Sequence, residues 1–261
     1  MSACQVISRM PGRKALLALS LCMPIAAQWQ VADKSIPRLP NGEPNVSAPA
    51  PRRTDGKPDL TGIWLPEPAR AGNIGSALKP GELPALPWAQ KLFDERKTGN
   101  LSALDPSANC LPQGVPRVNS TPAPFKVIQE PNVIVLLYEE FGQFRQIFLE
   151  GHVLPKDPNP QWYGYSQGKW DGDTLVVDSR GFNEKLWLDQ AGHPATASLH
   201  VTERFQRRDV GHMDIAATID DPGAYTKPWS YTQPLMLMVD TELIEYICNE
   251  NNGAIPHLKG K

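Results

Sequence analysis

Hydrophobic and polar residues alternate along much of the chain from residue 126 onward. The alternation is clearest in SLHVTERFQRR, over 198–208, and in HMDIAATID, over 212–220. A period of two is typical of a β-strand that buries one face and exposes the other. Asp171-Gly172-Asp173 separates two such segments and is typical of a tight hairpin, because glycine adopts a positive φ easily. The pattern therefore predicts a series of β-hairpins.

The predicted strands follow one another at short intervals, without helical segments between them. They are expected within 61–68, 125–129, 132–140, 141–151, 164–182, 198–208, 212–220, 230–239 and 241–248. Because a parallel βαβ fold needs helices between its strands, we predict a mainly β fold. The expected architecture is an antiparallel β-barrel of about eight strands, or a closed sandwich, with Trp64 packed inside one end.

The first half of the chain has a different composition, and sixteen of the 27 prolines in the whole sequence lie between 28 and 125. One short helix is expected at 87–97, where Pro87 suits the first helical position and Gly99 follows as a stop. We expect 28–58 to be an extended proline-rich linker and 59–261 to be a single domain.

The N-terminal residues 1–27 resemble a secretory signal peptide. Basic residues are followed by an apolar run over 15–27 that is too short to span a bilayer. Cleavage after Ala27 is expected, with lipidation at Cys22 as the alternative. No later apolar stretch reaches transmembrane length, so we expect a periplasmic or secreted protein without a transmembrane segment.

Cleavage would leave Cys110 and Cys248 as the two remaining cysteines. In an oxidising compartment the simplest expectation is one disulfide between them, although a reactive thiol stays open. Lys and Arg number 26 against 28 Asp and Glu, so no basic surplus indicates a nucleic-acid partner.

The common nucleotide-binding, metalloprotease and nucleophile motifs are missing, and we expect no cofactor and no metal. The most informative acid is Glu203, which shares a strand face with the apolar Val201 and Phe205. A buried carboxylate is costly unless it is paired. Glu203 is therefore either an internal catalytic acid or base, or the partner of a buried arginine, for which Arg145 is the first candidate.

Asp189 and His193 lie close together in a polar loop and are candidates for a catalytic acid–base pair. A metal site that includes His200 and His212 is the alternative, but the spacing of these residues is irregular. The third interpretation is that these residues form a hydrogen-bonded loop without a catalytic or metal-binding role. Aromatic side chains supply flat surfaces on which a ligand can pack. The candidate ligand-binding residues are therefore Arg145 and four aromatic residues: Tyr163, Trp187, Tyr225 and Trp229.

Several segments resemble those of a large family of exported bacterial proteins. They include DGKPDLTGIW at 55–64, GYSQGKWDGDTLVVDSRGFN at 164–183, DDPGAYTKPW at 220–229 and DTELIEYICNEN at 240–251. This resemblance implies export and implies no particular chemistry. Gly62-Ile63-Trp64 is similar to the Gly-x-Trp near the first strand of lipocalin-type calycins, which implies a barrel with an internal cavity.

Two functions of different classes remain open at this point. The first is an exported protein that binds a small apolar or amphipathic molecule inside the barrel. The second is a cofactor-independent lyase, isomerase or hydrolase that uses carboxylate and histidine acid–base chemistry in the same cavity. A structural role in the cell envelope and the oligomeric state also stay open, because a fold does not determine a function.

Overall fold

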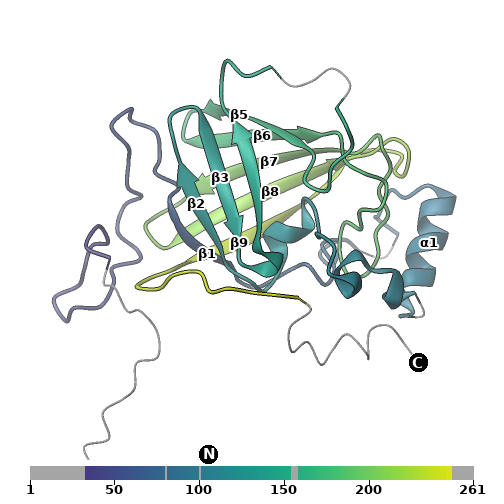
Figure 1. Cartoon of the computed structure of the whole chain (residues 1–261), viewed down its shortest axis with the longest axis horizontal. Helices are drawn as coiled ribbons and strands as arrows, with labels where there is room; N and C mark the ends of the chain where they lie inside the picture. Colours follow the sequence, from purple (N-terminus) through teal and green to yellow (C-terminus); the bar gives the residue numbers. More distant parts are fainter. Residues whose placement is uncertain (1–32, 80, 100, 154–157, 249–261) are drawn as a thin grey trace, which may run out of the picture.

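The computed structural model describes residues 33–79, 81–99, 101–153 and 158–248. The predicted signal peptide, its cleavage site and Cys22 lie outside these residues. Nine strands form a closed barrel, in which each strand pairs with the next and β9 returns to β1 (Figure 1). The strands are β1 (Gly62–Pro66), β2 (Phe125–Gln129), β3 (Val133–Tyr138), β4 (Gln143–Phe148), β5 (Tyr165–Asp171), β6 (Thr174–Arg180), β7 (His200–Arg207), β8 (His212–Asp220) and β9 (Trp229–Met238).

The other regular elements in the described residues are one α-helix and four short 3₁₀-helices. They are α1 (Pro87–Lys97), η1 (Ser102–Leu104), η2 (Pro106–Asn109), η3 (Arg117–Ser120) and η4 (Glu140–Gly142). The helix begins at Pro87 and Gly99 follows its end with φ at 80°, as the sequence predicts. Among the described residues, no helix is long and apolar enough to cross a membrane.

The predicted barrel is confirmed, with two differences in its strands. It has nine strands rather than about eight, and β4 pairs with β5 in parallel through Ile147↔Ser166 and Phe148↔Gln167. The chain between these strands, 149–164, is long enough to return along the barrel before β5 starts. A hairpin would have made this pair antiparallel.

The strand predicted at 241–248 is not present. Residues 241–247 are irregular, and Asp240 turns the chain away from the barrel with φ at 57°. The reason is closure: β9 already pairs with β8 on one side and with β1 on the other. No free edge is left for a further strand.

The alternation seen in the sequence determines which side chains fill the barrel. On β7, Val201, Glu203 and Phe205 point inward, and Glu203 is paired in register with Val177 on β6 and Ala217 on β8. Trp64 is fully buried, as predicted, and its indole N–H donates to the carbonyl of Leu60 at 3.0 Å.

The two ends of the barrel differ in the length of their connections. At one end, called here the loop end, the strands are joined by the long segments 67–124, 181–199 and 221–228, with α1 outside the barrel (Figure 1). At the other end the turns 130–132, 172–173 and 208–211 are short. Because function concentrates on long connections held by a rigid scaffold, the loop end is the first place to look for a site.

The proline-rich arm, 33–58, lies against the end with short turns (Figure 1). Val210 N–H donates to the carbonyl of Ala48 at 2.9 Å. Arg207 is buried there and donates to the carbonyls of Asp59 and Val210 at 2.5 and 2.6 Å. Burial lowers the pKa of Arg207 to about 10. Gly211 N–H also donates to the carbonyl of Val46 at 2.8 Å, so the arm is attached to the turn 208–211 rather than being a free linker.

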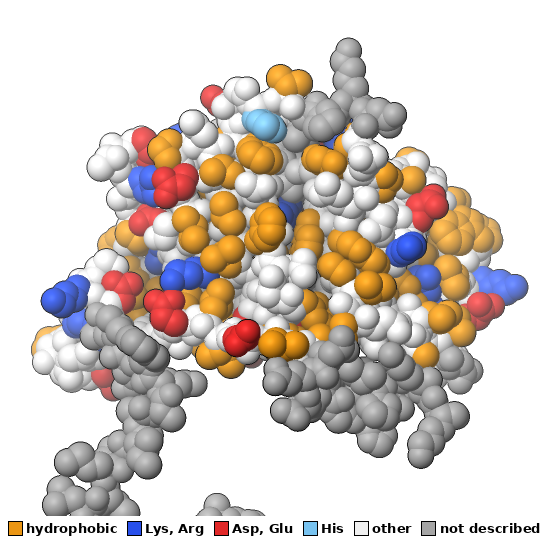
Figure 2. All heavy atoms as spheres, in the orientation of Figure 1, with side chains coloured by type: hydrophobic (Ala, Val, Ile, Leu, Met, Phe, Trp, Pro, Cys, Tyr) orange, Lys and Arg blue, Asp and Glu red, His pale blue; other side chains and the backbone are white. Residues whose placement is uncertain are grey.

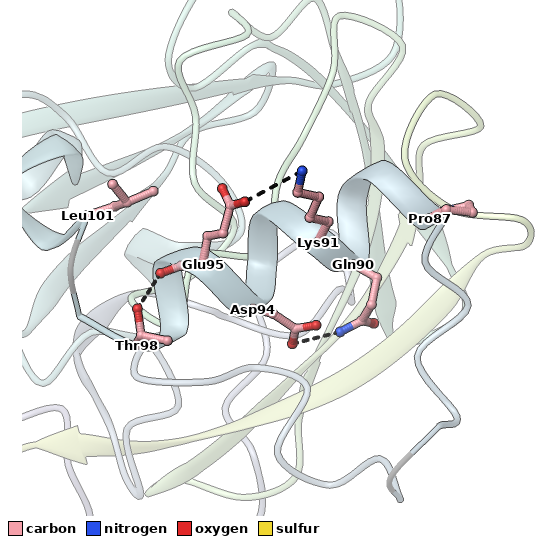
Figure 3. Close-up of a pocket in the computed structure, with 7 residues that line it drawn as sticks. All are labelled: Pro87, Gln90, Lys91, Asp94, Glu95, Thr98 and Leu101. Atoms are coloured by element: carbon pink, nitrogen blue, oxygen red, sulfur yellow. Dashed lines mark hydrogen bonds and ion pairs between the residues drawn. The ribbon is translucent and has the colours of Figure 1, made fainter.

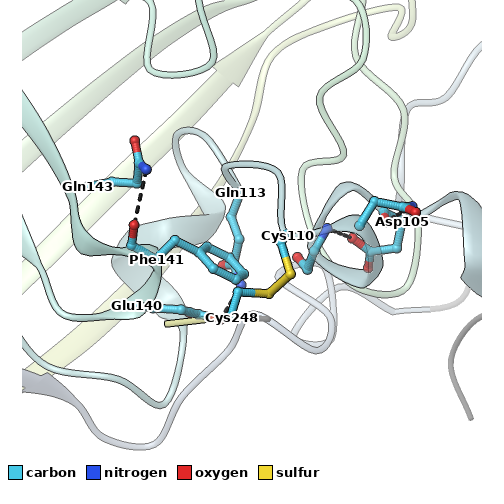
Figure 4. Close-up of a disulfide and its surroundings, with 9 residues drawn as sticks. Asp105, Cys110, Gln113, Glu140, Phe141, Gln143 and Cys248 are labelled. Carbon is cyan, nitrogen blue, oxygen red and sulfur yellow. Dashed lines mark hydrogen bonds between the residues drawn. A yellow bond between two sulfur atoms is a disulfide. The ribbon is translucent and has the colours of Figure 1, made fainter. Parts of the chain in front are cut away.

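Cys110 and Cys248 form the expected disulfide, with their Cα atoms 5.7 Å apart (Figure 4). The bond joins residues 138 positions apart in the sequence. It ties the segment that follows η2 to the end of the irregular segment 241–248. A reactive-thiol role for either cysteine is therefore excluded while the bond is intact.

Replacing both cysteines by serine should lower the free energy of unfolding by about 2–4 kcal/mol, because the crosslink restricts the unfolded chain. Urea unfolding followed by circular dichroism would measure the change. An unchanged urea midpoint would show that the bond contributes nothing to stability.

Candidate functional site

The structure divides the sequence-predicted site residues into two clusters, both at the loop end. The inner cluster contains Arg145 and Glu203, which lie inside the barrel, and Tyr163, which stacks on Tyr138. The outer cluster lies between α1 and the loops 181–199 and 221–228. It contains Trp187, Asp189, His193, Tyr225 and Trp229.

Arg145 on β4 and Glu203 on β7 form a buried ion pair. Arg145 Nη2 lies 2.5 Å from Glu203 Oε2, and the two side chains are 1% and 0% exposed. Burial is the largest single effect on the pKa of Arg145 and would lower it, but the charges and hydrogen bonds of Glu203 and Tyr138 together outweigh burial and raise that pKa. The arginine partner proposed from the sequence is therefore the observed one.

Polar side chains from four other elements form a hydrogen-bond network around this pair. Asn119 on η3 donates to Glu203 Oε1 at 2.6 Å and accepts from the Tyr138 hydroxyl at 2.7 Å. Arg145 also donates from Nε to Ser166 Oγ at 3.0 Å and from Nη2 to Ser179 Oγ at 2.9 Å. These bonds fix both charges in place, so that Glu203 is not a free acid or base.

Two atoms of the inner cluster have no hydrogen-bond partner among the described residues. They are Arg145 Nη1 and the hydroxyl oxygen of Tyr163, and both are buried. Tyr163 stacks on Tyr138, with ring centroids 5.7 Å apart. Burial raises the pKa of Tyr163, and the charge of Arg145 is close enough to oppose that rise. The two unpartnered groups are connected through Tyr138, which stacks on Tyr163 and donates to Asn119 beside Glu203.

Gln113 and Glu140 form a second polar pair at this end, near the disulfide (Figure 4). Gln113 Nε2 donates to Glu140 Oε1 at 2.8 Å, while Gln113 Oε1 and Glu140 Oε2 are buried without a partner among the described residues. Burial raises the pKa of Glu140.

In the outer cluster, Asp189 holds His193 in a single orientation. His193 Nδ1 lies 2.5 Å from Asp189 Oδ2. Asp189 is fully buried and also accepts from the backbone N–H groups of Ile74, Gly192 and His193 itself, at 2.9–3.1 Å. Because the carboxylate accepts from Nδ1–H, the lone pair of the neutral ring lies on Nε2.

Aromatic rings surround His193. Phe93 on α1 stacks on the imidazole at 4.1 Å between centroids, and Trp229 lies at 5.5 Å. Tyr225 meets Trp229 edge to face at 5.4 Å. The guanidinium of Arg96 lies over one face of the Trp187 ring, 4.1 Å from the ring centroid. This face of Trp187 therefore cannot contact a ligand.

The other two histidines considered from the sequence lie elsewhere. His200 bonds to Asp178 on β6, and His212 lies 2.7 Å from Asp209. The described residues contain no group of three or more His, Cys, Asp and Glu side chains placed to hold a metal. The hypothesis of a metal site built from Asp189, His193, His200 and His212 is therefore wrong.

Two surface features do not have the chemistry of a site. The hollow along α1 is lined by side chains that pair with one another, such as Gln90 with Asp94 at 3.0 Å and Lys91 with Glu95 at 4.0 Å (Figure 3). Apolar side chains gather on the outer face of β3 and β4, where Phe144 is 60% exposed (Figure 2). That face is open to water rather than enclosed.

The site residues predicted from the sequence did not include Asn119, Ser166 and Ser179, nor Gln113 and Glu140. Ser166 and Ser179 occupy inward positions of β5 and β6, so strand alternation could have identified them as polar groups inside the barrel. Asn119, Gln113 and Glu140 lie outside the strands, where the sequence carries no periodic signal.

Comparisons with models of known protein families, with curated proteins and with solved structures found no match. The case for a function therefore rests on the two clusters.

Substituting Glu203 by glutamine should cost about 3–5 kcal/mol of stability, because it leaves the Arg145 cation buried without its counter-charge. The matched control is Arg204→Gln, which breaks the exposed pair of Arg204 with Asp171 and should cost about 1 kcal/mol or less. Equal urea midpoints for the two variants would contradict a structural role for the buried pair.

Four tyrosines should resist ionisation until the protein unfolds. Burial raises the pKa values of Tyr138, Tyr163, Tyr225 and Tyr231. A raised folded-state pKa stabilises the protein below the unfolded value of about 10, and that stability is lost as the pH rises further. We expect phenolate absorbance from these four residues to appear together with loss of the circular-dichroism signal above about pH 10. Reversible ionisation of all six tyrosines in the folded protein would be the contrary result.

Proposed function

We propose that this protein is exported and binds a small amphipathic molecule inside the loop end of the barrel, between Tyr163 and Arg145. The observation that carries the proposal is the pair of buried, unpartnered polar atoms, Arg145 Nη1 and the Tyr163 hydroxyl. An unpartnered buried donor costs about 1–3 kcal/mol. A bound molecule with an acceptor atom removes this cost.

The surrounding charges favour a neutral ligand with a polar head. Arg145 is already neutralised by Glu203 at 2.5 Å, so the site has no net positive charge to offer an anion. A carbonyl, ether or hydroxyl oxygen can accept from Arg145 Nη1 and from the Tyr163 hydroxyl. The aromatic rings of Tyr138 and Tyr163 then supply an apolar surface for the rest of the molecule.

Tyr163 is the residue through which such a molecule would enter. It is half-buried and lies just before β5, where it covers Tyr138 from the loop side. The Arg145–Glu203 pair is held inside the barrel by β4 and β7. Rigid polar groups combined with a partly exposed aromatic ring are typical of small-molecule pockets.

Export is supported by the disulfide, which forms and persists in oxidising compartments. It is also supported by the signal-peptide pattern of residues 1–27 and by the resemblance to exported bacterial proteins.

The direct test is titration with prodan, a neutral fluorescent naphthalene ketone whose carbonyl can accept from Arg145. We expect saturable binding of one prodan molecule per chain. Tyr163→Phe removes only the unpartnered hydroxyl and should weaken affinity about two- to tenfold. Tyr163→Ala also removes the ring and should weaken it further.

Tyr165→Phe is the matched control, because the Tyr165 hydroxyl accepts from Gln161 at 3.0 Å on an exposed part of the same segment. Its affinity should equal that of the native protein. Absence of saturable prodan binding, or equal affinity in Tyr163→Ala and native protein, would overturn the proposal.

A further inference from the structure

We infer that a second ligand site lies between the proline-rich arm and the barrel, and that it binds a fatty acid, a single carboxylate on an alkyl chain. A cavity of about 790 Å³ opens there, lined by residues of the arm, of β1, β2 and β9, and of 240–242. Its volume is within the usual range of small-molecule pockets. The cavity is near the end with short turns, so the inference does not rest on ligand binding at the loop end.

The floor of this cavity is largely apolar. Met238, Ile63 and Lys126 lie side by side in register on the outer face of the barrel, and all three line the cavity. Ile63 is only 5% exposed although it lies on the outer face. Ile36 and Pro37 of the arm line the same cavity. An alkyl chain bound here would be shielded from water, which is favourable for every CH₂ group that it buries.

The carboxylates around the cavity already have partners. Each of the four that line it accepts a hydrogen bond within the described chain. The pairs are Asp33 with Ser35, Asp59 with Thr61, Asp240 with Arg38 and Glu242 with Lys126. Two cations that line the cavity, Lys34 and Arg207, have no carboxylate bound to them among the described residues. The cavity therefore offers charged donors to a ligand.

Arg207 is the residue that would hold the carboxylate. It is 8% exposed, and its side chain donates four hydrogen bonds, all to backbone carbonyls, those of Asp59, Thr61, Asp209 and Val210. A guanidinium has five N–H donors, so one N–H of Nη2 is left over. Burial lowers the pKa of Arg207 to about 10, and the charges of Asp59 and Asp209 oppose this only in part. A bound carboxylate supplies both an acceptor and a counter-charge.

The same charges limit the class of ligand. Four carboxylates at one cavity repel a ligand that carries more than one negative charge, such as a phosphate. The apolar floor gives no advantage to a small ion without a chain. A single carboxylate at the end of an alkyl chain satisfies both conditions.

The first test compares decanoate with 1-decanol by isothermal titration calorimetry on the whole protein. The two ligands have chains of the same length and differ in the charge of the head group. We expect decanoate to bind at least about tenfold more tightly, because a hydrogen bond between two charged groups is stronger than one to a hydroxyl. Equal affinities for the two ligands would overturn the inference.

A pair of tryptophan variants locates the site. Ile128 lines the cavity from β2, and Val135 pairs with it in register on the same outer face but does not line the cavity. Ile128→Trp fills the cavity and should weaken decanoate binding about tenfold or more. Val135→Trp is the matched control and should bind decanoate like the native protein. Equal decanoate affinities in the two variants would overturn the inference.

Two further variants test the head group and separate the sites. Arg207→Gln should abolish the preference for decanoate over decanol, while Arg204→Gln, an exposed arginine on the same strand, should keep it. A folded Arg207→Gln that retains the preference would contradict the inference. If Arg207→Gln does not fold, the ligand pair and the tryptophan pair decide the question. Tyr163→Ala should bind decanoate like the native protein, and loss of decanoate binding there would place the acid in the inner cluster instead.

Discussion

The ion pair between Arg145 and Glu203 is the interaction on which the arrangement of the barrel interior depends. It crosses the barrel from β4 to β7, and both side chains are almost completely buried. Removing two charges from water is expensive, so the pair needs other groups that satisfy most of its remaining bonds. Ser166, Ser179 and Asn119 do so, which ties β5, β6 and η3 to the same centre.

The same constraint explains why the loop end is elaborate. Asn119 comes from η3, inside the long connection between β1 and β2, so this connection must fold over the barrel to reach Glu203. A second buried pair, Arg117 with Asp105 at 2.8 Å, holds that connection in shape. The disulfide anchors it to the end of the described chain. The connection between β1 and β2 and the polar interior of the barrel therefore depend on each other.

Local patterns in the sequence predicted the parts of the fold that have local causes. Strand alternation identified the hairpins of β5–β6 and β7–β8, and Pro87 with Gly99 bounded α1. The placement of Glu203 on an apolar face led to its arginine partner. Closure of the barrel is a property of the whole sheet. It removed the expected last strand, which local alternation could not reveal.

The site was predictable to a similar degree. Asp189 and His193 are four residues apart and could be paired from the sequence. Ile74, which donates its N–H to Asp189, comes from a segment more than a hundred positions away, and only the folded chain brings the two together. Long-range contacts of this kind leave no periodic trace, because loops follow no repeat.

The central claim is that the buried, unpartnered atoms of the inner cluster are ligand-binding groups. The most direct measurement is a crystal structure of the protein grown with prodan. The account predicts density for one prodan molecule inside the loop end, with its carbonyl oxygen within hydrogen-bond distance of Arg145 Nη1 and the Tyr163 hydroxyl. Density for prodan only on the outer surface, with Tyr163 still stacked on Tyr138 and the interior filled by protein side chains, would contradict it.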